Sequence, residues 1–177
     1  GIEYKTDDDG QIYSVRDKTD DGSQSYSVRG HLSPNFTYKL RGAIYKTDAL
    51  GRIVHVEATP GRSPENARDL DAQREAGGGD RRPDDQGGHI LGRDLGGDAG
   101  NGNLIAMNPK INQSDYKRME NDIKAALDAR KGVTMKADIH YLGSKTRPDR
   151  ITVTVTVDGK STVYKFDNNI DGALRSE

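Results

Sequence analysis

The segment Pro83-Asp-Asp-Gln-Gly-Gly-His-Ile-Leu-Gly-Arg-Asp-Leu-Gly-Gly97 places a histidine, His89, among small residues and after two carboxylates. It lies within a longer stretch, residues 80–103, in which glycine and aspartate dominate. We predict a loop with at most short strands there, and a loop this long inside a compact domain is usually functional. A histidine with a pKa near neutrality is a suitable general base when a carbonyl or carboxylate orients its ring. His89 is therefore the first candidate for catalysis.

The other three histidines are better explained as structural. His55 and His140 fall within alternating, strand-like segments, and His31 falls in a turn region. The sequence has no Cys nucleophile, no Gly-x-Ser-x-Gly motif, no closely spaced His pair for zinc and no phosphate-binding glycine loop. Residues 17–28 imitate the opening of a calcium loop, but Val28 stands where such a loop needs a bidentate glutamate.

A second group of polar residues lies downstream, where Asn103-Leu-Ile precedes Asn112-Gln-Ser-Asp-Tyr-Lys-Arg-Met-Glu120. Apolar residues at helical spacing predict a helix over Asn112–Arg130. Asn112 and Glu120 are separated by about 80° past two full turns, so they share roughly one helix face. An amide oxygen and a carboxylate so placed can hold a hydrated Mg²⁺. The alternative is a helix-capping Asn and a surface Glu.

Strand-like segments flank these two groups. The first 58 residues alternate with period two between turn signals, which predicts a meander of strands. A helix is predicted from the cap-like Ser63-Pro64-Glu65 to Ala76. Three strands follow the second helix, over 133–142, 151–157 and 161–166, the last two joined by an Asp-Gly turn. We therefore expect an α+β fold.

Composition narrows the classes of protein further. The chain has 177 residues, 27 Lys and Arg, 28 Asp and Glu, and no Cys, which excludes disulfides and thiolate metal sites. No apolar run approaches the roughly 20 residues that cross a bilayer, so we expect no membrane span. Residues 1–30 are acidic on balance and residues 109–150 are basic. The second half is therefore the better place for an anionic partner. The alternative, which charge by itself favours, is that both stretches are ordinary solvated surfaces.

In order and spacing, these residues resemble the DNA/RNA non-specific endonucleases of the His-Me finger, or ββα-metal, superfamily. Within it they resemble the C-terminal toxin domains of bacterial polymorphic toxins. The resemblance rests on Asp-Asp-x-Gly-Gly-His-Ile-Leu-Gly around His89, then Gly-Gly, Asn-Leu-Ile, Asn-x-x-x-Tyr and Glu, and it covers residues 43–168. It implies an antiparallel sheet with a ββα-metal core and a central helix that carries the metal site.

The resemblance also implies a role for each matching residue. His89 would be the general base that activates water against the phosphodiester, and Asn103 would stabilise either the reacting phosphate or the geometry of the site. Asn112 would be the single direct ligand of Mg²⁺, for which Mn²⁺ could substitute. Glu120 would serve catalysis by holding that ion through bound water, and the ion would offset charge that builds on the phosphate.

One departure from the family pattern concerns the phosphate. Better-studied members have Asp-Arg-Gly-His where this sequence has Gln86-Gly-Gly-His89, so the arginine of that motif is missing. Arg93, Arg82, Arg52 or Arg118 could take its place, and the sequence does not choose among them.

The prediction is thus a metal-dependent, non-specific endonuclease of DNA, with RNA as a second candidate substrate. As an antibacterial toxin effector it would be secreted or translocated and would act in the cytoplasm of a target bacterium, where a cognate immunity protein would block it. We expect residues 43–177 to form the nuclease and residues 1–42 a β-rich extension, in a chain excised from a larger protein. The alternatives are an RNase or selective DNase of the same fold, and a non-catalytic β-rich binding module.

Overall fold

The computed structural model describes residues 3–6, 12–18, 24–28, 31–64 and 68–169. Its largest element is a six-stranded antiparallel sheet in the order β12-β11-β10-β7-β6-β5. These strands are β5 (Thr37–Leu40), β6 (Ala43–Thr47), β7 (Ile53–Ala58), β10 (Val133–His140), β11 (Arg150–Val157) and β12 (Lys160–Asp167).

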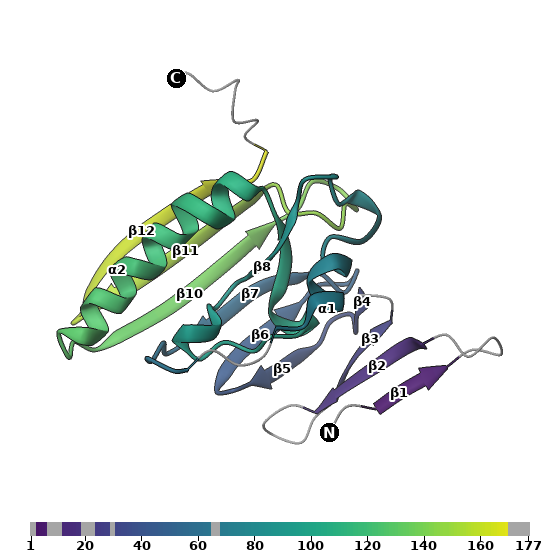
Figure 1. Cartoon of the computed structure of the whole chain (residues 1–177), viewed down its shortest axis with the longest axis horizontal. Coiled ribbons are helices and arrows are strands. Elements are labelled where there is room, and N and C mark those ends of the chain that lie inside the picture. The colour runs from purple at the N-terminus through teal and green to yellow at the C-terminus, as the bar shows by residue number, and fades with distance from the viewer. Residues whose placement is uncertain (1–2, 7–11, 19–23, 29–30, 65–67, 170–177) are drawn as a thin grey trace.

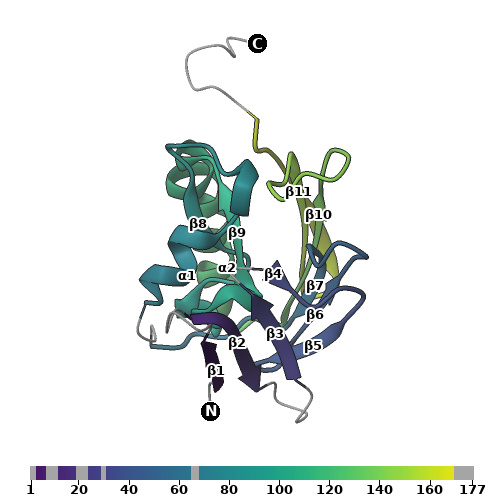
Figure 2. The same cartoon turned by 90° about the vertical axis from the view of Figure 1, so that its right-hand side faces the viewer.

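A second layer, here called the helical layer, spans residues 70–128 and lies against one face of the sheet (Figure 2). Its elements are α1 (Leu70–Glu75), β8 (Gln86–His89), β9 (Leu104–Met107), a π-helical segment (Ile111–Asp115) and α2 (Tyr116–Asp128), with short 3₁₀ turns at Gly78–Asp80, Arg93–Leu95 and Asn101–Asn103. Strands β8 and β9 pair antiparallel and lead into α2, which gives the ββα order. The predicted α+β fold with a ββα unit is confirmed.

The strands of the sheet alternate apolar and polar residues, so one face of the sheet is buried and the other is exposed. In β10 every second side chain, from Val133 to Ile139, is buried, and the residues between are exposed. In β11 the buried positions are Ile151, Val153 and Val155. Asp158 and Gly159 both have positive φ, at 48° and 84°, which is the type I′ turn that joins closely paired strands. The Asp-Gly hairpin expected from the sequence is therefore present.

The long helix α2 lies against this sheet, as Figure 1 shows, and its apolar face is the buried one. Tyr116, Met119 and Ile123 are buried on that face, and the rings of Tyr116 and Phe166 lie 5.0 Å apart. The sequence-based helix is thus confirmed, with the π-helical segment supplying its first turn and α2 ending at Asp128.

The predicted strands of the first 58 residues belong to two sheets and not to one meander. Four short strands, β1 (Glu3–Thr6), β2 (Ile12–Lys18), β3 (Gln24–Val28) and β4 (His31–Leu32), pair in sequence order. Strand β5 pairs with β6 across the boundary at residue 43 that we expected between extension and nuclease. That boundary stays a prediction. The loop that imitates a calcium site includes residues 19–23, outside the described residues.

The helix expected over residues 63–76 is shorter at its start than predicted. The structure begins α1 at Leu70, because the side chain of Asp69 accepts a hydrogen bond from the Ala72 amide at 3.0 Å and caps the helix. Ser63 is instead tied into a loop, where its amide donates to the Asp94 carbonyl. Residues 65–67 of this prediction lie outside the described part of the chain.

No helix in the described residues is long and apolar enough to span a membrane.

Candidate active site

His89 ends strand β8, and its ring orientation follows from one hydrogen bond. Its Nε2 atom lies 3.2 Å from the carbonyl oxygen of Ala99. A carbonyl only accepts, so Nε2 carries the proton and Nδ1 of the neutral ring is left with a lone pair. His89 therefore has the tautomer that a general base needs.

The surroundings of His89 favour the neutral ring. Burial lowers its pKa below the ordinary 6.5, and the positive charges of Arg93 and Arg68 lower it further. The Ala99 carbonyl and Asp98 act in the opposite direction without reversing the shift. Near pH 7 the imidazole is consequently unprotonated and able to accept a proton.

Two cavities meet at His89. The larger, of about 570 Å³, extends from His89 to α1. The smaller, of about 160 Å³, extends from His89 to Glu120 on α2. In the part of the chain that the structure describes, four residues line both cavities, namely His89, Arg93, Asn112 and Lys117. The structure thus brings three of the four predicted site residues, His89, Asn112 and Glu120, to one place.

Asn112 lies in the π-helical segment and contacts strand β8. Its Nδ2 atom donates to Oε1 of Gln86 at 2.9 Å. This contact fixes the amide so that Oδ1, the better metal ligand, is the atom not used by Gln86. Gln86 stands in the sequence where the family motif has Asp, and its link to Asn112 was not predicted.

Glu120 reaches the smaller cavity because its neighbour across the gap has no side chain. A Cβ atom built on Gly92 would lie 2.2 Å from Oε2 of Glu120. Beside them, Lys124 forms an ion pair with Asp94, so these two charges offset each other. The substitution Gly92→Ala would therefore force the Glu120 carboxylate to move.

Asn103, the fourth predicted residue, is fully buried and is not among the residues that line the two cavities. Its Oδ1 accepts from the Tyr45 hydroxyl at 2.9 Å and from the Leu91 amide at 3.1 Å. Its Nδ2 donates to the carbonyls of Leu91 and Asp98, both at 2.8 Å. Asn103 therefore joins the loop after His89 to the loop that carries Ala99, the partner of the His89 ring.

The structure separates the four arginines considered for the phosphate. Arg93 lines both cavities. Arg52 is bound to Asp48 and to the carbonyls of Gly143 and Lys145, and Arg82 donates to Asn169. Neither these two nor the exposed Arg118 is among the residues that line the two cavities.

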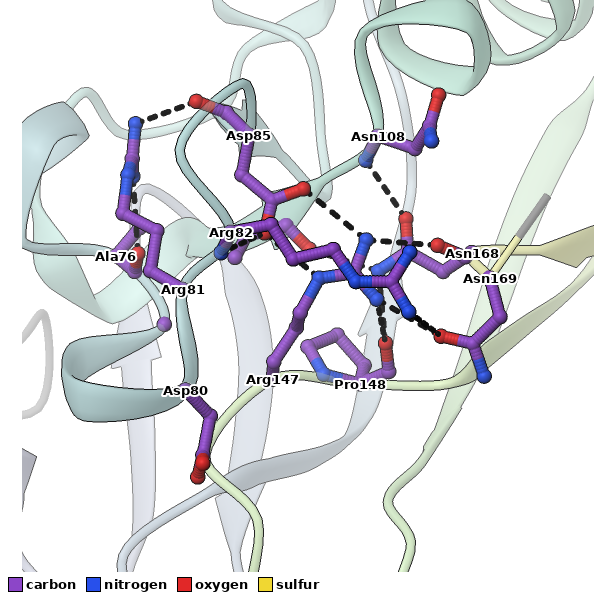
Figure 3. A network of polar contacts seen from close by, with 12 residues as sticks. Ala76, Asp80, Arg81, Arg82, Asp85, Asn108, Arg147, Pro148, Asn168 and Asn169 are labelled. Carbon is purple, nitrogen blue, oxygen red and sulfur yellow. Dashed lines mark hydrogen bonds and ion pairs between the residues drawn. The ribbon is translucent and has the colours of Figure 1, made fainter. Parts of the chain in front are cut away.

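A buried ion pair just before β8 was missed by the sequence reasoning (Figure 3). Nε and Nη2 of Arg147 donate to the two carboxylate oxygens of Asp85 at 2.6 and 3.0 Å, and both side chains are almost fully buried. Arg147 also donates to the Asn168 carbonyl. The pair thus joins the β10–β11 loop to the start of the His89 strand. Asp85 and Arg147 are 62 residues apart in the sequence, and no local signal pairs them.

No group of three or more His, Asp or Glu side chains suited to a metal occurs among the described residues. A metal at this site would therefore depend on Asn112, Glu120 and water.

Comparison with known proteins identifies the family of this chain. The model of the family described as DNA/RNA non-specific endonuclease matches residues 34–159. Over 133 residues, or 72% of this chain, the sequence is 32% identical to the type VII secretion system protein EssD of Staphylococcus aureus, of which it spans 22%. Over 85 residues, or 48% of this chain, it is 33% identical to the probable deoxyribonuclease RhsA of Dickeya dadantii, of which it spans 6%.

Among solved structures, the Sda1 nuclease with bound zinc ion matches 97% of this chain and 75% of its own, with a TM-score of 0.48 and 17% identity. The relatives agree with the predicted polymorphic-toxin branch. By the family match across residues 34–159, the chain belongs to the DNA/RNA non-specific endonuclease family.

Proposed function

We propose that this domain is a metal-dependent endonuclease that hydrolyses phosphodiester bonds of DNA and acts as an antibacterial toxin effector. One observation carries the proposal: a neutral, oriented His89 lies where the cavity lined by Asn112 and Glu120 meets the cavity lined by α1. A base, a place for a hard cation and an open cleft for substrate therefore converge.

His89 is the general base of the proposed reaction. Its Nδ1 takes the proton from the attacking water while Nε2 keeps its hydrogen bond to the Ala99 carbonyl. This hydrogen bond stabilises the imidazolium that forms. Asn103 keeps the two loops around this histidine in place. Of the two roles that the resemblance left for Asn103, we propose the positional one, since its side chain is buried and four hydrogen bonds use it.

The donor set of the smaller cavity fits a hydrated Mg²⁺. Asn112 offers Oδ1 while its Nδ2 donates a hydrogen bond to Oε1 of Gln86, and the Glu120 carboxylate lines the same space. These hard oxygen donors suit Mg²⁺, which keeps most of its water, and Mn²⁺ has the same preference. When bound, the ion supplies positive charge to the phosphate and the leaving oxygen.

Arg93 takes the role of the arginine missing from the family motif. It lines both cavities next to His89, and its charge is close enough to lower the histidine pKa. A guanidinium so placed can stabilise the negative charge of the reacting phosphate.

The role as an effector rests on the relatives. The chain spans 22% of EssD, a secretion system protein, and 6% of RhsA, so its delivery and its target belong to the proposal. We propose that it is secreted or translocated, acts in the cytoplasm of a target bacterium and is blocked by a cognate immunity protein. Expression inside bacteria should arrest growth, and His89→Ala should relieve the arrest.

The activity is tested with supercoiled plasmid and with total RNA, each in Mg²⁺ and in EDTA. We expect plasmid loss that needs Mg²⁺ and falls strongly in Asn112→Ala and in Glu120→Gln. Matched controls on the same helix are Asn121→Ala and Asp122→Asn, which should cleave as the wild type does.

Other outcomes select the alternatives. Loss of RNA alone would make the domain an RNase. Cleavage of neither substrate by folded protein would favour the non-catalytic β-rich binding module.

A further inference from the structure

One wall of the larger cavity is formed by α1 and the residue two positions before it, and it comprises Arg68, Leu70, Gln73 and Arg74. This wall has no part in the proposed chemistry. We propose that this wall is a nucleotide subsite, which binds the backbone phosphate and the base next to the phosphate that is cleaved. The inference rests on the proposed function and names where the substrate strand continues.

The two cavities define a direction for the strand. A phosphate bound at the four shared residues would have the smaller cavity and Glu120 on one side. It would have the larger cavity and α1 on the other. The larger cavity, at about 570 Å³, falls within the range of roughly 300–1,000 Å³ that is typical of small-ligand sites. It is therefore large enough for the adjoining nucleotide, whereas the smaller cavity of about 160 Å³ is not.

The charge of this wall suits a phosphate. Arg68 and Arg74 line the larger cavity together with Arg93 and Lys117. Among the described residues, the one acidic residue that lines this cavity is Asp85, which is neutralised by its buried pair with Arg147. Arg74 also lies 3.5 Å from Asp71 of the same helix, with both side chains strongly exposed. The positive charge of Arg68 also lowers the pKa of His89.

Among the described residues of this basic wall, one has an apolar side chain. Leu70, the first residue of α1, lines the larger cavity with 54% of its surface exposed. Gln73, which has an amide side chain, lines the same wall. An exposed leucine between arginines offers an apolar contact for a base or a sugar while the arginines take the phosphate.

The wall is held rigidly against the catalytic strand, as a binding site requires. A Cβ atom on Gly87 would lie 2.5 Å from the backbone oxygen of Gln73, so only glycine lets α1 approach β8 this closely. Arg81 then donates to the carbonyls of Gln73 and Ala76 at one end and of Asp85 at the other. Arg81 is therefore a brace and not a phosphate ligand.

The test measures binding of a labelled oligonucleotide to His89→Ala protein in EDTA, so that no cleavage interferes. Adding Arg74→Ala should raise Kd and reduce the slope of log Kd against log salt by about one, the loss of one phosphate contact. Adding Leu70→Ala should raise Kd and leave the salt slope unchanged.

The controls match in chemistry and exposure but line neither cavity. Arg150 is 67% exposed, against 75% for Arg74, and Leu142 is 55% exposed. Arg150→Ala and Leu142→Ala should leave Kd unchanged. Unchanged binding in both α1 variants, or equal losses in the controls, would overturn the subsite while plasmid cleavage still stands. A wild type that cleaves no nucleic acid would instead overturn the proposed function.

Discussion

The sheet and the helical layer share one core but are held by different forces. In β10 and β11 the core side chains are apolar and follow from a period of two. Around the site, Asn103, Asn168, Asp85 and Arg147 are buried and fully engaged in polar contacts. The sheet thus gains stability from a repeated local pattern, whereas the site depends on a few contacts between distant residues.

The largest expected effect lies at the contact between the two regions. Arg147→Ala leaves the buried Asp85 carboxylate without its partner, and breaking a buried pair in this way costs about 3–5 kcal/mol. We expect the free energy of unfolding in urea to fall by that amount.

Arg62→Ala is the matched control, because it breaks an Arg–Asp pair of 3.2 Å with both side chains exposed. Its loss should stay below about 1 kcal/mol. Equal losses in the two variants would contradict the view that burial gives the Arg147 pair its importance.

The second prediction separates stability from chemistry within the sheet. Met135→Ala removes a buried side chain from β10 and should cost about 2–5 kcal/mol. Its exposed neighbour on the same strand, Lys136, should tolerate alanine within about 1 kcal/mol. Cleavage per folded molecule, measured well below both midpoints of unfolding, should be unchanged in each variant. A slower reaction in Met135→Ala would mean that the sheet shapes the site.

The same contrast explains how much could be predicted from the sequence. The strands around the Asp158-Gly159 turn and the helix after Asn112 follow from local periodicity and turn chemistry, and the structure confirms both. Ser63-Pro64 had the composition of a helix start, but Asp69 caps α1. Its position is set by distant contacts, such as the close approach of Gln73 to Gly87.

Site residues divide in the same way. Motif spacing singled out His89, Asn112 and Glu120, which the fold brings together. The contact of Gln86 with Asn112 and the pair of Asp85 with Arg147 span 26 and 62 residues of sequence, beyond the reach of local patterns.

Gly92→Ala tests the claim that missing side chains shape the site. A Cβ atom there would displace the Glu120 carboxylate, and disturbance of a group that holds a metal through water typically costs 10- to 100-fold in activity. We expect a higher Mg²⁺ concentration for half-maximal cleavage, with little change in unfolding. Gly61→Ala, where a Cβ atom meets nothing within 4 Å, is the control.

The smallest expected effects concern pH. Only unprotonated His89 acts as a base, so kcat/KM should rise with pH and level off once pH exceeds the lowered histidine pKa, which is below 6.5. Arg93→Gln removes a charge that lowers this pKa and should move the acid limb to higher pH. Asp98→Asn removes a charge that raises it and should move the limb to lower pH. Shifts of the same sign in both variants would contradict the electrostatic account.

The most direct test of the central claim is the rate of plasmid cleavage by His89→Ala, with and without added imidazole. Removal of a general base should slow the reaction by about 10²–10⁴-fold. Imidazole diffusing into the space next to the two cavities should then restore part of the rate, in proportion to its neutral form. A folded His89→Ala protein that cleaves plasmid at the rate of the wild type would contradict the assignment of His89 as the base.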